Sequence, residues 1–345
     1  MKNLAHAVIG IGGILALLIL GKSTLIPLTL GLVLWFLSRY FKNLINSIPI
    51  IKQRAPSWLV STLVFALVVL GLSFFAQLIT KNVQNLLASG DLYQANVDRV
   101  VQLLNAQLDF DLYTQLTQQL KEFDYQSLIS QVADSISTVL GDTAMILIYA
   151  AFMFSEEASF GLKFRKLFSS EEDHEQGVEI MRQINQSVSD YIRLKTLVSL
   201  MTGAIGYVFL LIMGVEAAFF WAFLIFVLNY IPTIGSLVAT AFPAFFSLLQ
   251  FGELTPFLII LVGLGAVQLL VGNVVEPRIM GKSLNLSPLV TILALVVWGV
   301  IWGIVGMLLS VPITVIMVII FSHFEGTRKA AILLSETGEI NPKVA

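Results

Sequence analysis

The sequence predicts an all-α, polytopic transmembrane protein with about eight membrane helices, and three observations lead to this fold class. Of its 345 residues, 57% are hydrophobic and only 12% are charged, whereas soluble domains average roughly 45–50% apolar and roughly 25% charged residues. The mean hydropathy is +0.87. Apolar runs close to the roughly 20 residues that one helical crossing needs recur along the chain.

The apolar runs define the predicted elements in order. The first is read as a retained membrane helix because it ends in Gly21-Lys22-Ser23 and leads straight into the second, without a cleavage site for a signal peptide. The ten candidate segments are residues 4–21, 24–38, 58–79, 138–155, 197–215, 217–231, 234–251, 255–275, 287–302 and 304–322.

Two pairs of these runs meet at a tight break, at Pro232 and at Gly303. Either all ten runs span the membrane, or the stretches 217–251 and 287–322 are re-entrant hairpins that enter from opposite sides. The second arrangement gives six full spans and two hairpins. Irregular backbone at membrane depth is tolerated where protein or a water-filled cavity covers it.

Basic residues in the connecting segments predict the orientation. The connector 39–57 contains four basic residues and no acid, so we expect it to be cytoplasmic. The stretch 80–137 has three basic residues against seven acids and is expected outside, whereas 156–196 carries six basic residues and is expected inside. Both termini are therefore predicted to be cytoplasmic.

The same pattern divides the chain into five predicted parts. Leucine and valine recur at helical spacing in the polar stretch 80–137, which indicates a small helical domain. The parts are N-terminal membrane helices with a basic connector (1–79), an extracytoplasmic polar insert (80–137), a membrane helix with an amphipathic cytoplasmic segment (138–196), a C-terminal membrane core (197–322) and a cytoplasmic tail (323–345).

Several function classes are disfavoured. The chain has no cysteine, three scattered histidines and a net charge of −2, so we expect no metal site, no cofactor and no nucleic-acid partner. The two Gly-Lys-Ser sequences lack the earlier glycine of a phosphate-binding loop, because Ala16 and Glu276 occupy its place. Common hydrolase motifs are absent as well. We therefore expect no enzymatic activity and no catalytic residues.

The first candidate site surrounds the break near residues 231–235. Pro232 removes a backbone donor and Gly235 frees the backbone, so a helix should break or kink there. The freed carbonyls and the Asn229 side chain would then face a substrate path. The alternative is a plain turn between two helices at the cytoplasmic surface.

The second candidate site follows the run 255–275. Ionisable groups at the end of an apolar run are costly unless paired, and they often mark an ion or substrate path. The alternative is an interfacial salt bridge that fixes the helix ends. The predicted path residues of this stretch are Gln268, Asn273, Glu276, Pro277, Arg278, Gly281 and Lys282.

Glycines and prolines of the last run are interpreted as structural. Gly299, Gly303 and Gly306 lie at spacings that let helices approach closely, and Pro312 is expected to kink the last span. Asp142 and Glu216 are expected at helix ends that face water.

These motifs resemble the autoinducer-2 exporter family. The resemblance rests on the run Val275-Glu276-Pro277-Arg278-Ile279-Met280-Gly281-Lys282-Ser283-Leu284, on Ser287-Pro288-Leu289-Val290, on Trp298 to Pro312, and on the break from Asn229 to Gly235. It is specific over about 228–312 and architectural before that. Ser236 departs from it, because the family often has proline at that position.

The resemblance implies an inner-membrane permease of about eight helices that forms a homo-oligomer. It implies export of autoinducer-2 or, for some members, exchange of sodium or lithium for protons. It also points to Pro288 as a motif residue, besides the path and packing residues named above.

Three functional hypotheses remain open from the sequence. The leading one is a secondary transporter, not driven by ATP, that exports a small polar solute such as autoinducer-2. The second is a sodium or lithium/proton antiporter with Glu276 or Asp142 as the titrating carboxylate. The third is a scaffold that binds a partner through the insert 80–137. The expected partners are membrane lipids, the solute or a monovalent cation, and further copies of the chain.

Overall fold

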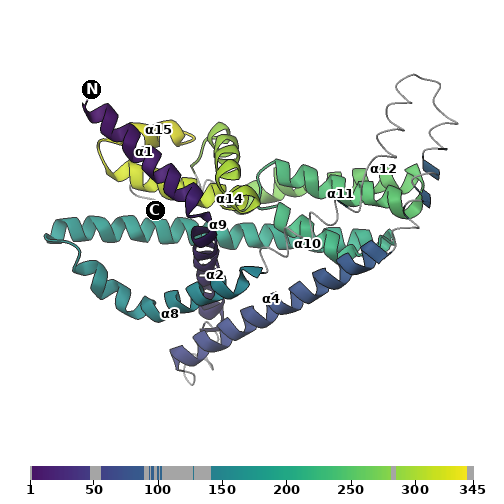
Figure 1. The fold of residues 1–345 in the computed structure, drawn as a ribbon, viewed down its shortest axis with the longest axis horizontal. Coiled ribbons are helices and arrows are strands. Elements are labelled where there is room, and N and C mark those ends of the chain that lie inside the picture. Colours follow the sequence, from purple (N-terminus) through teal and green to yellow (C-terminus); the bar gives the residue numbers. More distant parts are fainter. Residues whose placement is uncertain are drawn as a thin grey trace. The chain divides into compact units, whose positions relative to one another are not determined.

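Every regular element in the described part of the computed structural model is a helix (Figure 1). The structure describes residues 2–46, 56–88, 141–280 and 285–339, with a few single positions between 89 and 140. The isolated bridge between Leu286 and Ser335 is the one strand-like pairing among them. The predicted all-α class is therefore confirmed.

The chain packs as two compact units, 1–69 with 142–194 and 282–345, and 70–141 with 195–281. This division cuts α4 and α9 and differs from the five sequential parts predicted above, because packing follows contacts between distant segments. The helices are α1 (Lys2–Leu20), α2 (Lys22–Asn46), α4 (Ser57–Ala88), α8 (Thr143–Arg165), α9 (Glu171–Ile212), α10 (Ala218–Leu228), α11 (Ile234–Phe251), α12 (Leu254–Leu270), the π-helix η1 (Val271–Val275), α13 (Glu276–Met280), α14 (Pro288–His323) and α15 (Arg328–Leu334).

Six described helices are long and apolar enough to cross a membrane, and α8, bent by 68°, makes a seventh when its two parts are taken together. The six are α2, α4, α9, α11, the continuous stretch from α12 to α13, and α14. The 11-residue apolar helix α10 is shorter, and α1 is not among the seven. Large apolar side chains are exposed on these helices, as expected where lipid is the solvent.

In the unit formed by 1–69, 142–194 and 282–345, α2 packs closely on α8. A side-chain carbon at Gly31 would lie 3.0 Å from the carbonyl oxygen of Ile146, which is tighter than most such contacts, so glycine favours this close approach. Leu34, Ile146 and Ala150 form the buried cluster at that contact. A second cluster gathers Trp298, Trp302 and Leu309 of α14, with partly buried residues of α1 and α2 around it.

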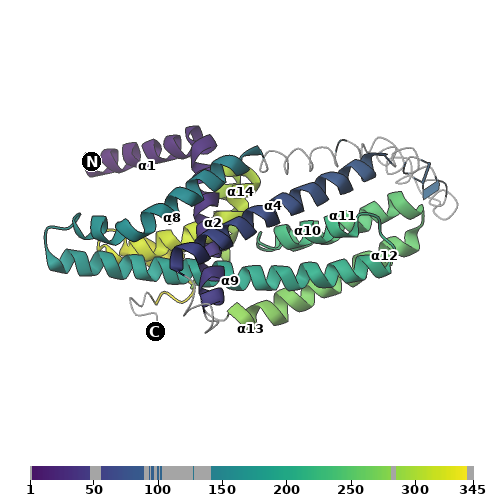
Figure 2. The ribbon, with the colours of Figure 1, turned by 90° about the horizontal axis from the view of Figure 1, so that it is seen from below.

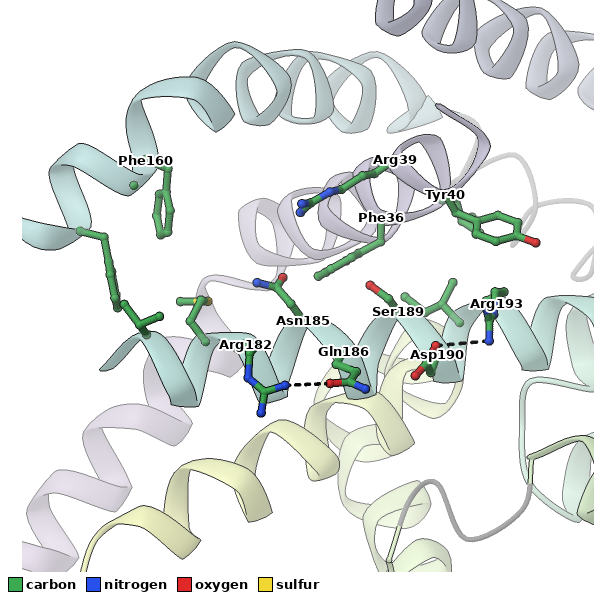
Figure 3. Close-up of a pocket in the computed structure, with 16 residues that line it drawn as sticks. Phe36, Arg39, Tyr40, Phe160, Arg182, Asn185, Gln186, Ser189, Asp190 and Arg193 are labelled. Carbon is green, nitrogen blue, oxygen red and sulfur yellow. Dashed lines mark hydrogen bonds and ion pairs between the residues drawn. The ribbon is translucent and has the colours of Figure 1, made fainter. Parts of the chain in front are cut away.

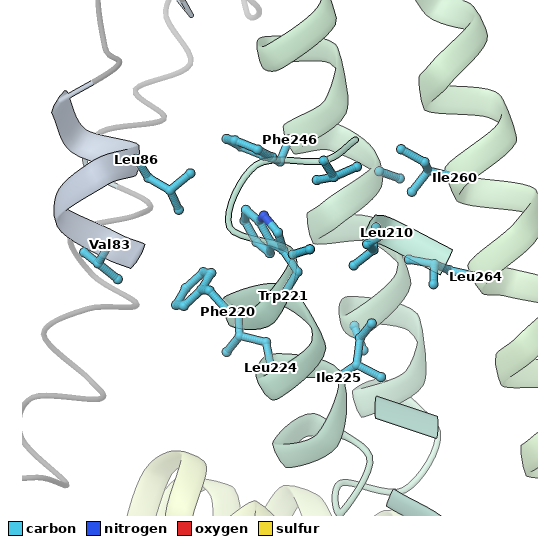
Figure 4. Packing of buried hydrophobic residues seen from close by; sticks show 14 of the residues in the cluster. Val83, Leu86, Leu210, Phe220, Trp221, Leu224, Ile225, Phe246, Ile260 and Leu264 are labelled. Carbon is cyan, nitrogen blue, oxygen red and sulfur yellow. The ribbon is translucent and has the colours of Figure 1, made fainter. Parts of the chain in front are cut away.

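In the unit formed by 70–141 and 195–281, the second half of α9 lies beside α10, α11 and α12 (Figures 1 and 2). Leu210, Phe220, Trp221, Ile225 and Leu264 are buried between these helices (Figure 4). The polar residues described next belong to the same unit as this apolar core.

α9 is one continuous helix of 42 residues. The sequence analysis placed an amphipathic segment before residue 196 and a separate span after it. The change from polar to apolar sequence near 193–197 marks a change of environment, but helix propensity does not require a break there. At 1.5 Å per residue, α9 is about 63 Å long, roughly twice the hydrocarbon thickness of a bilayer.

Candidate functional site

The helix breaks between α10 and α11, at residues 229–233, which overlaps the interval predicted from Pro232 and Gly235. Thr233 adopts a positive φ of 61°, which is costly for a β-branched residue. The side chain of Ser236 donates a hydrogen bond to the carbonyl of Thr233 at 2.9 Å and so supports the first turn of α11.

Gly235 lets the chain fold back on itself at this break. A side-chain carbon at this position would overlap the carbonyl oxygen of Leu228, the last residue of α10. Because that atom is backbone, it cannot move aside without deforming α10. Glycine is therefore required by packing at Gly235, whose φ is not in the left-handed region.

The break is held against one turn of α9 by two side-chain hydrogen bonds. The Asn229 amide donates to the Ser199 hydroxyl at 3.1 Å, and both residues are buried, with Ser199 fully inaccessible. The hydroxyls of Thr196 and Tyr230 lie 2.6 Å apart and share a hydrogen bond. Both contacts lie between helices that are otherwise packed through apolar side chains.

The third contact to the same turn is an ion pair between Lys195 and Glu276. The Lys195 side chain is 6% exposed and that of Glu276 is 24% exposed. A buried charge is costly unless it is paired, and here each group supplies the other's countercharge. Glu276 thus pairs with Lys195, and not with its neighbour Arg278.

A π-helix positions Glu276. η1 covers Val271–Val275 and is followed directly by α13, in which Glu276 is the first residue and Pro277 the second. Proline cannot donate a backbone hydrogen bond, and its ring would collide with the carbonyl four residues earlier, at Asn273. The wider π-helical turn accommodates both effects and rotates the following residues relative to α12.

These contacts bring two separately predicted regions, the break at 229–233 and Glu276, to one turn of α9, residues 195–199. We call Lys195, Thr196, Ser199, Asn229, Tyr230 and Glu276 the polar cluster. Its ion pair has no net charge, and its remaining groups are hydroxyls and an amide. Such a set can hydrogen-bond a neutral polar solute, and the carboxylate can bind a cation if Lys195 moves away.

The other predicted path residues are placed differently. Gln268 is buried in α12, whereas Asn273, Pro277 and Arg278 are exposed. Arg278 forms no ion pair with another described residue. Gly281 and Lys282 lie outside the described residues.

The predicted packing residues lie in α14, which folds back at Gly303. Gly303 has φ 62° and ψ −141°, the one non-helical conformation inside this helix. A side chain at Gly306 would overlap the carbonyl oxygen of Trp298, and one at Gly299 would lie 2.9 Å from the Met307 side chain. The stretches before and after Gly303 therefore form a hairpin.

Pro288 begins α14 and Pro312 is buried in its second half. The departure from helical geometry is at Gly303, and Pro312 lies in a stretch with helical backbone angles. Trp302 next to the turn donates a hydrogen bond to the carbonyl of Leu18 at 3.0 Å.

The sequence analysis missed four members of the polar cluster: Lys195, Thr196, Ser199 and Tyr230. Lys195 was counted as a basic residue that marks the cytoplasmic side. A spacing signal was available, because Thr196, Ser199 and Thr202 recur every three residues at the start of an apolar run. A polar stripe of this kind on a membrane helix points to a helix–helix contact or a path.

Coordination of a metal ion would need several ligating side chains close together. Within the ranges that the structure describes, no three histidine, aspartate or glutamate side chains come together in a way that could hold a metal ion.

Residues 7–326 match the family model described as AI-2E family transporter. A putative transport protein of Haemophilus influenzae is 32% identical over 351 residues, which covers 97% of each chain. The AI-2 transport protein TqsA of Escherichia coli K12 is 35% identical over 210 residues, and the match covers 61% of this chain and 60% of TqsA. The putative transport protein YhhT of the same organism is 34% identical over 199 residues, covering 58% of this chain and 56% of YhhT.

Proposed function

The chain belongs to the AI-2E transporter family and is a multi-pass membrane permease, and from this premise we propose that it is a secondary exporter of a small, polar, uncharged solute similar to autoinducer-2. The relatives described above are named as transport proteins, which argues against an enzyme. TqsA is named for AI-2 transport, whereas the other two names give no substrate. The substrate and the direction are therefore part of the proposal.

The polar cluster is the observation that carries this proposal. It places hydroxyl and amide groups of Thr196, Ser199, Asn229 and Tyr230 inside a helical unit whose core is otherwise apolar. Burying polar groups costs free energy unless they are hydrogen-bonded. In this cluster the polar groups form hydrogen bonds with one another. A hydroxylated solute can replace each of these hydrogen bonds with one of its own.

We place this permease in the inner membrane, with both termini in the cytoplasm and further copies of itself as partners. The polar cluster then lies toward the cytoplasmic end of its helices. This position supports a role in taking up the solute from the cytoplasm before export.

The experiment compares solute release from a deletion strain that carries the wild-type chain or one of two variants. Asn229→Leu removes the amide that bonds Ser199, and we expect export of autoinducer-2 to fall about tenfold, since one buried hydrogen bond contributes about 1–1.5 kcal/mol. Thr314→Val is the matched control, because this buried hydroxyl bonds the Ser310 carbonyl of its own helix. Unchanged extracellular and intracellular autoinducer-2 in the deletion strain would refute the proposed substrate.

A sodium or lithium/proton antiporter is the second candidate, and the Lys195–Glu276 pair favours it. A carboxylate paired with a buried lysine can exchange that internal cation for Na⁺, Li⁺ or a proton. Asp142, the other carboxylate considered, is in the unit formed by 1–69, 142–194 and 282–345. There it lines a pocket together with Lys22 and Gly303.

Everted membrane vesicles test this second candidate. Addition of sodium or lithium should collapse a proton gradient in vesicles with the wild-type chain and fail to do so with Glu276→Gln. Asp142→Asn is the control for the other carboxylate. The absence of any cation response in wild-type vesicles would rule the antiporter out and leave the solute exporter untouched.

A further inference from the structure

A large cavity lies in the unit formed by 1–69, 142–194 and 282–345, which does not contain the polar cluster. It has a volume of about 610 Å³ and is lined by the end of α2, the second part of α8 and the first half of α9. Figure 3 shows Arg39 and Phe36 of α2 facing Asn185 and Ser189 of α9 across it. The proposed function uses none of these residues.

The cavity lies where two helices change from apolar to polar sequence. Its α2 residues, 36–40, are at the end of the candidate span Lys22–Lys42. Its α9 residues, 178–193, belong to the polar half of that helix and directly precede the apolar half. We therefore expect the cavity at the level of lipid headgroups, on the side that the basic connector 39–57 predicts to be cytoplasmic.

One wall of the cavity is basic and polar. The Arg39 guanidinium lies 5.4 Å from the centre of the Trp35 ring, and its Nε is 3.6 Å from Glu157. Arg193 is 3.4 Å from Asp190. Neither arginine donates a hydrogen bond to another described residue, so each keeps terminal N–H groups for a ligand.

The third arginine of the cavity is already engaged. Arg182 donates two hydrogen bonds to Glu179 and one to Gln186, at 2.7–3.3 Å. The amide of Asn185 and the hydroxyl of Ser189 line the space beside it and bond no other described residue. They add neutral hydrogen-bonding groups between the guanidinium groups of Arg39 and Arg193.

The other wall is apolar, with Phe36, Leu37, Phe160, Phe164, Val178 and Met181. Phe160 and Val178 are exposed, with 49% and 45% of their surface accessible. The apolar side chains of this wall are therefore accessible to an acyl chain. A soluble anion would use the guanidinium groups and leave this wall unfilled.

We propose that this cavity binds the phosphate headgroup of an anionic phospholipid, with an acyl chain along the apolar wall. A guanidinium fork matches phosphate oxygens in a bidentate geometry. Basic pockets between membrane helices on the cytoplasmic side suit anionic headgroups. Each of the three arginines has a carboxylate beside it, but the contacts of Arg39 to Glu157 and of Arg193 to Asp190 are long, at 3.6 and 3.4 Å, so a phosphate can compete for these two guanidinium groups. The inference is independent of the transported solute.

The test uses the full-length protein, purified in detergent and stripped of lipid, and measures its melting temperature during titration with phosphatidylglycerol. We expect a saturable rise with phosphatidylglycerol, a much smaller rise with phosphatidylcholine, and none with inorganic phosphate at the same concentration. In Arg39→Gln/Arg193→Gln the affinity for phosphatidylglycerol should fall about a hundredfold, about tenfold for each guanidinium that no longer bonds the phosphate.

Arg165→Gln is the matched control, since this exposed arginine pairs with Glu171 and does not line the cavity. It should keep the wild-type affinity. Equal responses to both lipids, an equal response to phosphate alone, or a double variant with unchanged affinity would each overturn the proposal.

A second measurement does not depend on the variants folding. Wild-type protein is irradiated in vesicles with phosphatidylglycerol that carries a photoreactive headgroup, and the cross-linked peptides are identified. Cross-links within 36–40 and 182–193 support the site. Cross-links confined to other segments overturn it. The proposal also fails if the cross-links within 36–40 and 182–193 persist under a tenfold excess of unlabelled phosphatidylglycerol.

Discussion

Lys195 is the residue on which the candidate site depends most. Its side chain is 6% exposed and its charge is balanced by Glu276 alone among the described residues. Removing one partner of a buried pair leaves an uncompensated charge, whereas replacing both can be nearly neutral. The pair therefore acts as a unit in the free energy of unfolding.

We predict that Lys195→Met destabilises the protein by about 2–3 kcal/mol. This is below the roughly 3–5 kcal/mol of a fully buried pair, because Glu276 is partly accessible. The double variant Lys195→Met/Glu276→Gln should recover most of the loss, since it leaves no unpaired charge. Thermal unfolding in detergent measures both.

Lys163→Met provides the control for that measurement. Lys163 pairs with Glu156 on an exposed surface, and exposed pairs contribute only about 0–1 kcal/mol. If the double variant of the buried pair were as unstable as Lys195→Met alone, the ion pair would not be the cause of the loss.

Asn96 ties the polar insert to the end of α11. Its side-chain amide donates to the carbonyls of Leu249 and Gln250, at 2.9 and 2.8 Å, where α11 ends. We predict that Asn96→Ala costs about 1–2 kcal/mol, because the two carbonyls lose their donor. The variant should be cleaved faster by protease within 80–137, and an unchanged cleavage rate would show that the insert is held elsewhere.

Two hairpins with a common construction are the main elements of the structure. In each, a glycine that follows the turn meets a backbone carbonyl of the preceding helix: Gly235 against Leu228, and Gly306 against Trp298. One hairpin is in each unit. The same steric requirement thus holds for two stretches with different sequences.

We predict that Gly235→Ala and Gly306→Ala each destabilise the protein by at least about 3 kcal/mol, because the added carbon meets backbone that cannot rotate away. Gly265→Ala is the control. Gly265 lies inside α12 with no atom near the added carbon, so alanine should leave stability unchanged or raise it by about 0.5–1 kcal/mol. Thermal unfolding of the three variants separates packing from helix propensity.

The positions of both hairpin turns could be predicted from local signals, because proline and glycine act on the backbone within a few residues. Pro232 and Gly303 mark the turns at 229–233 and 303. The continuity of α9 was not predictable from hydropathy, since the change of polarity near residue 195 resembles a boundary. The π-helix before Pro277 had a signal in the proline, but its consequence for Glu276 depends on packing.

The partners of the candidate residues could not be predicted, because they are far apart in the chain. Lys195 and Glu276 are 81 positions apart, and Ser199 and Asn229 are 30 apart. Such pairings depend on which faces of α9, α10 and α13 meet. The sequence therefore identified Asn229 and Glu276 as candidates but not the turn of α9 that both of them contact.

At the scale of the whole molecule, two contacts in the unit formed by 70–141 and 195–281 each join segments that are predicted to lie on the same side of the membrane. Lys195 and Glu276 lie in two segments that the basic residues place inside, and they contact each other. Tyr93 of the insert that is predicted to be outside donates a hydrogen bond to Glu216 at 2.6 Å, at the turn between α9 and α10. One of these contacts is thus on the predicted cytoplasmic side of the unit formed by 70–141 and 195–281, and the other is on its predicted outer side.

Accessibility labelling tests this topology directly, because the chain contains no cysteine. Single cysteines are placed at four exposed positions, Gly141, Arg165, Glu253 and Arg278. A membrane-impermeant maleimide added to spheroplasts should label the cysteines at 141 and 253, because 141 is near the end of the run 138–155 that adjoins the insert 80–137, and 253 lies in the turn between the runs 234–251 and 255–275, which this topology places outside. The cysteines at 165 and 278 should react only after permeabilisation, as the excess of lysine and arginine on the cytoplasmic side requires. Labelling of position 278 in intact spheroplasts would show that the polar cluster lies toward the outer side. A solute would then first reach Asn229 from outside the cell.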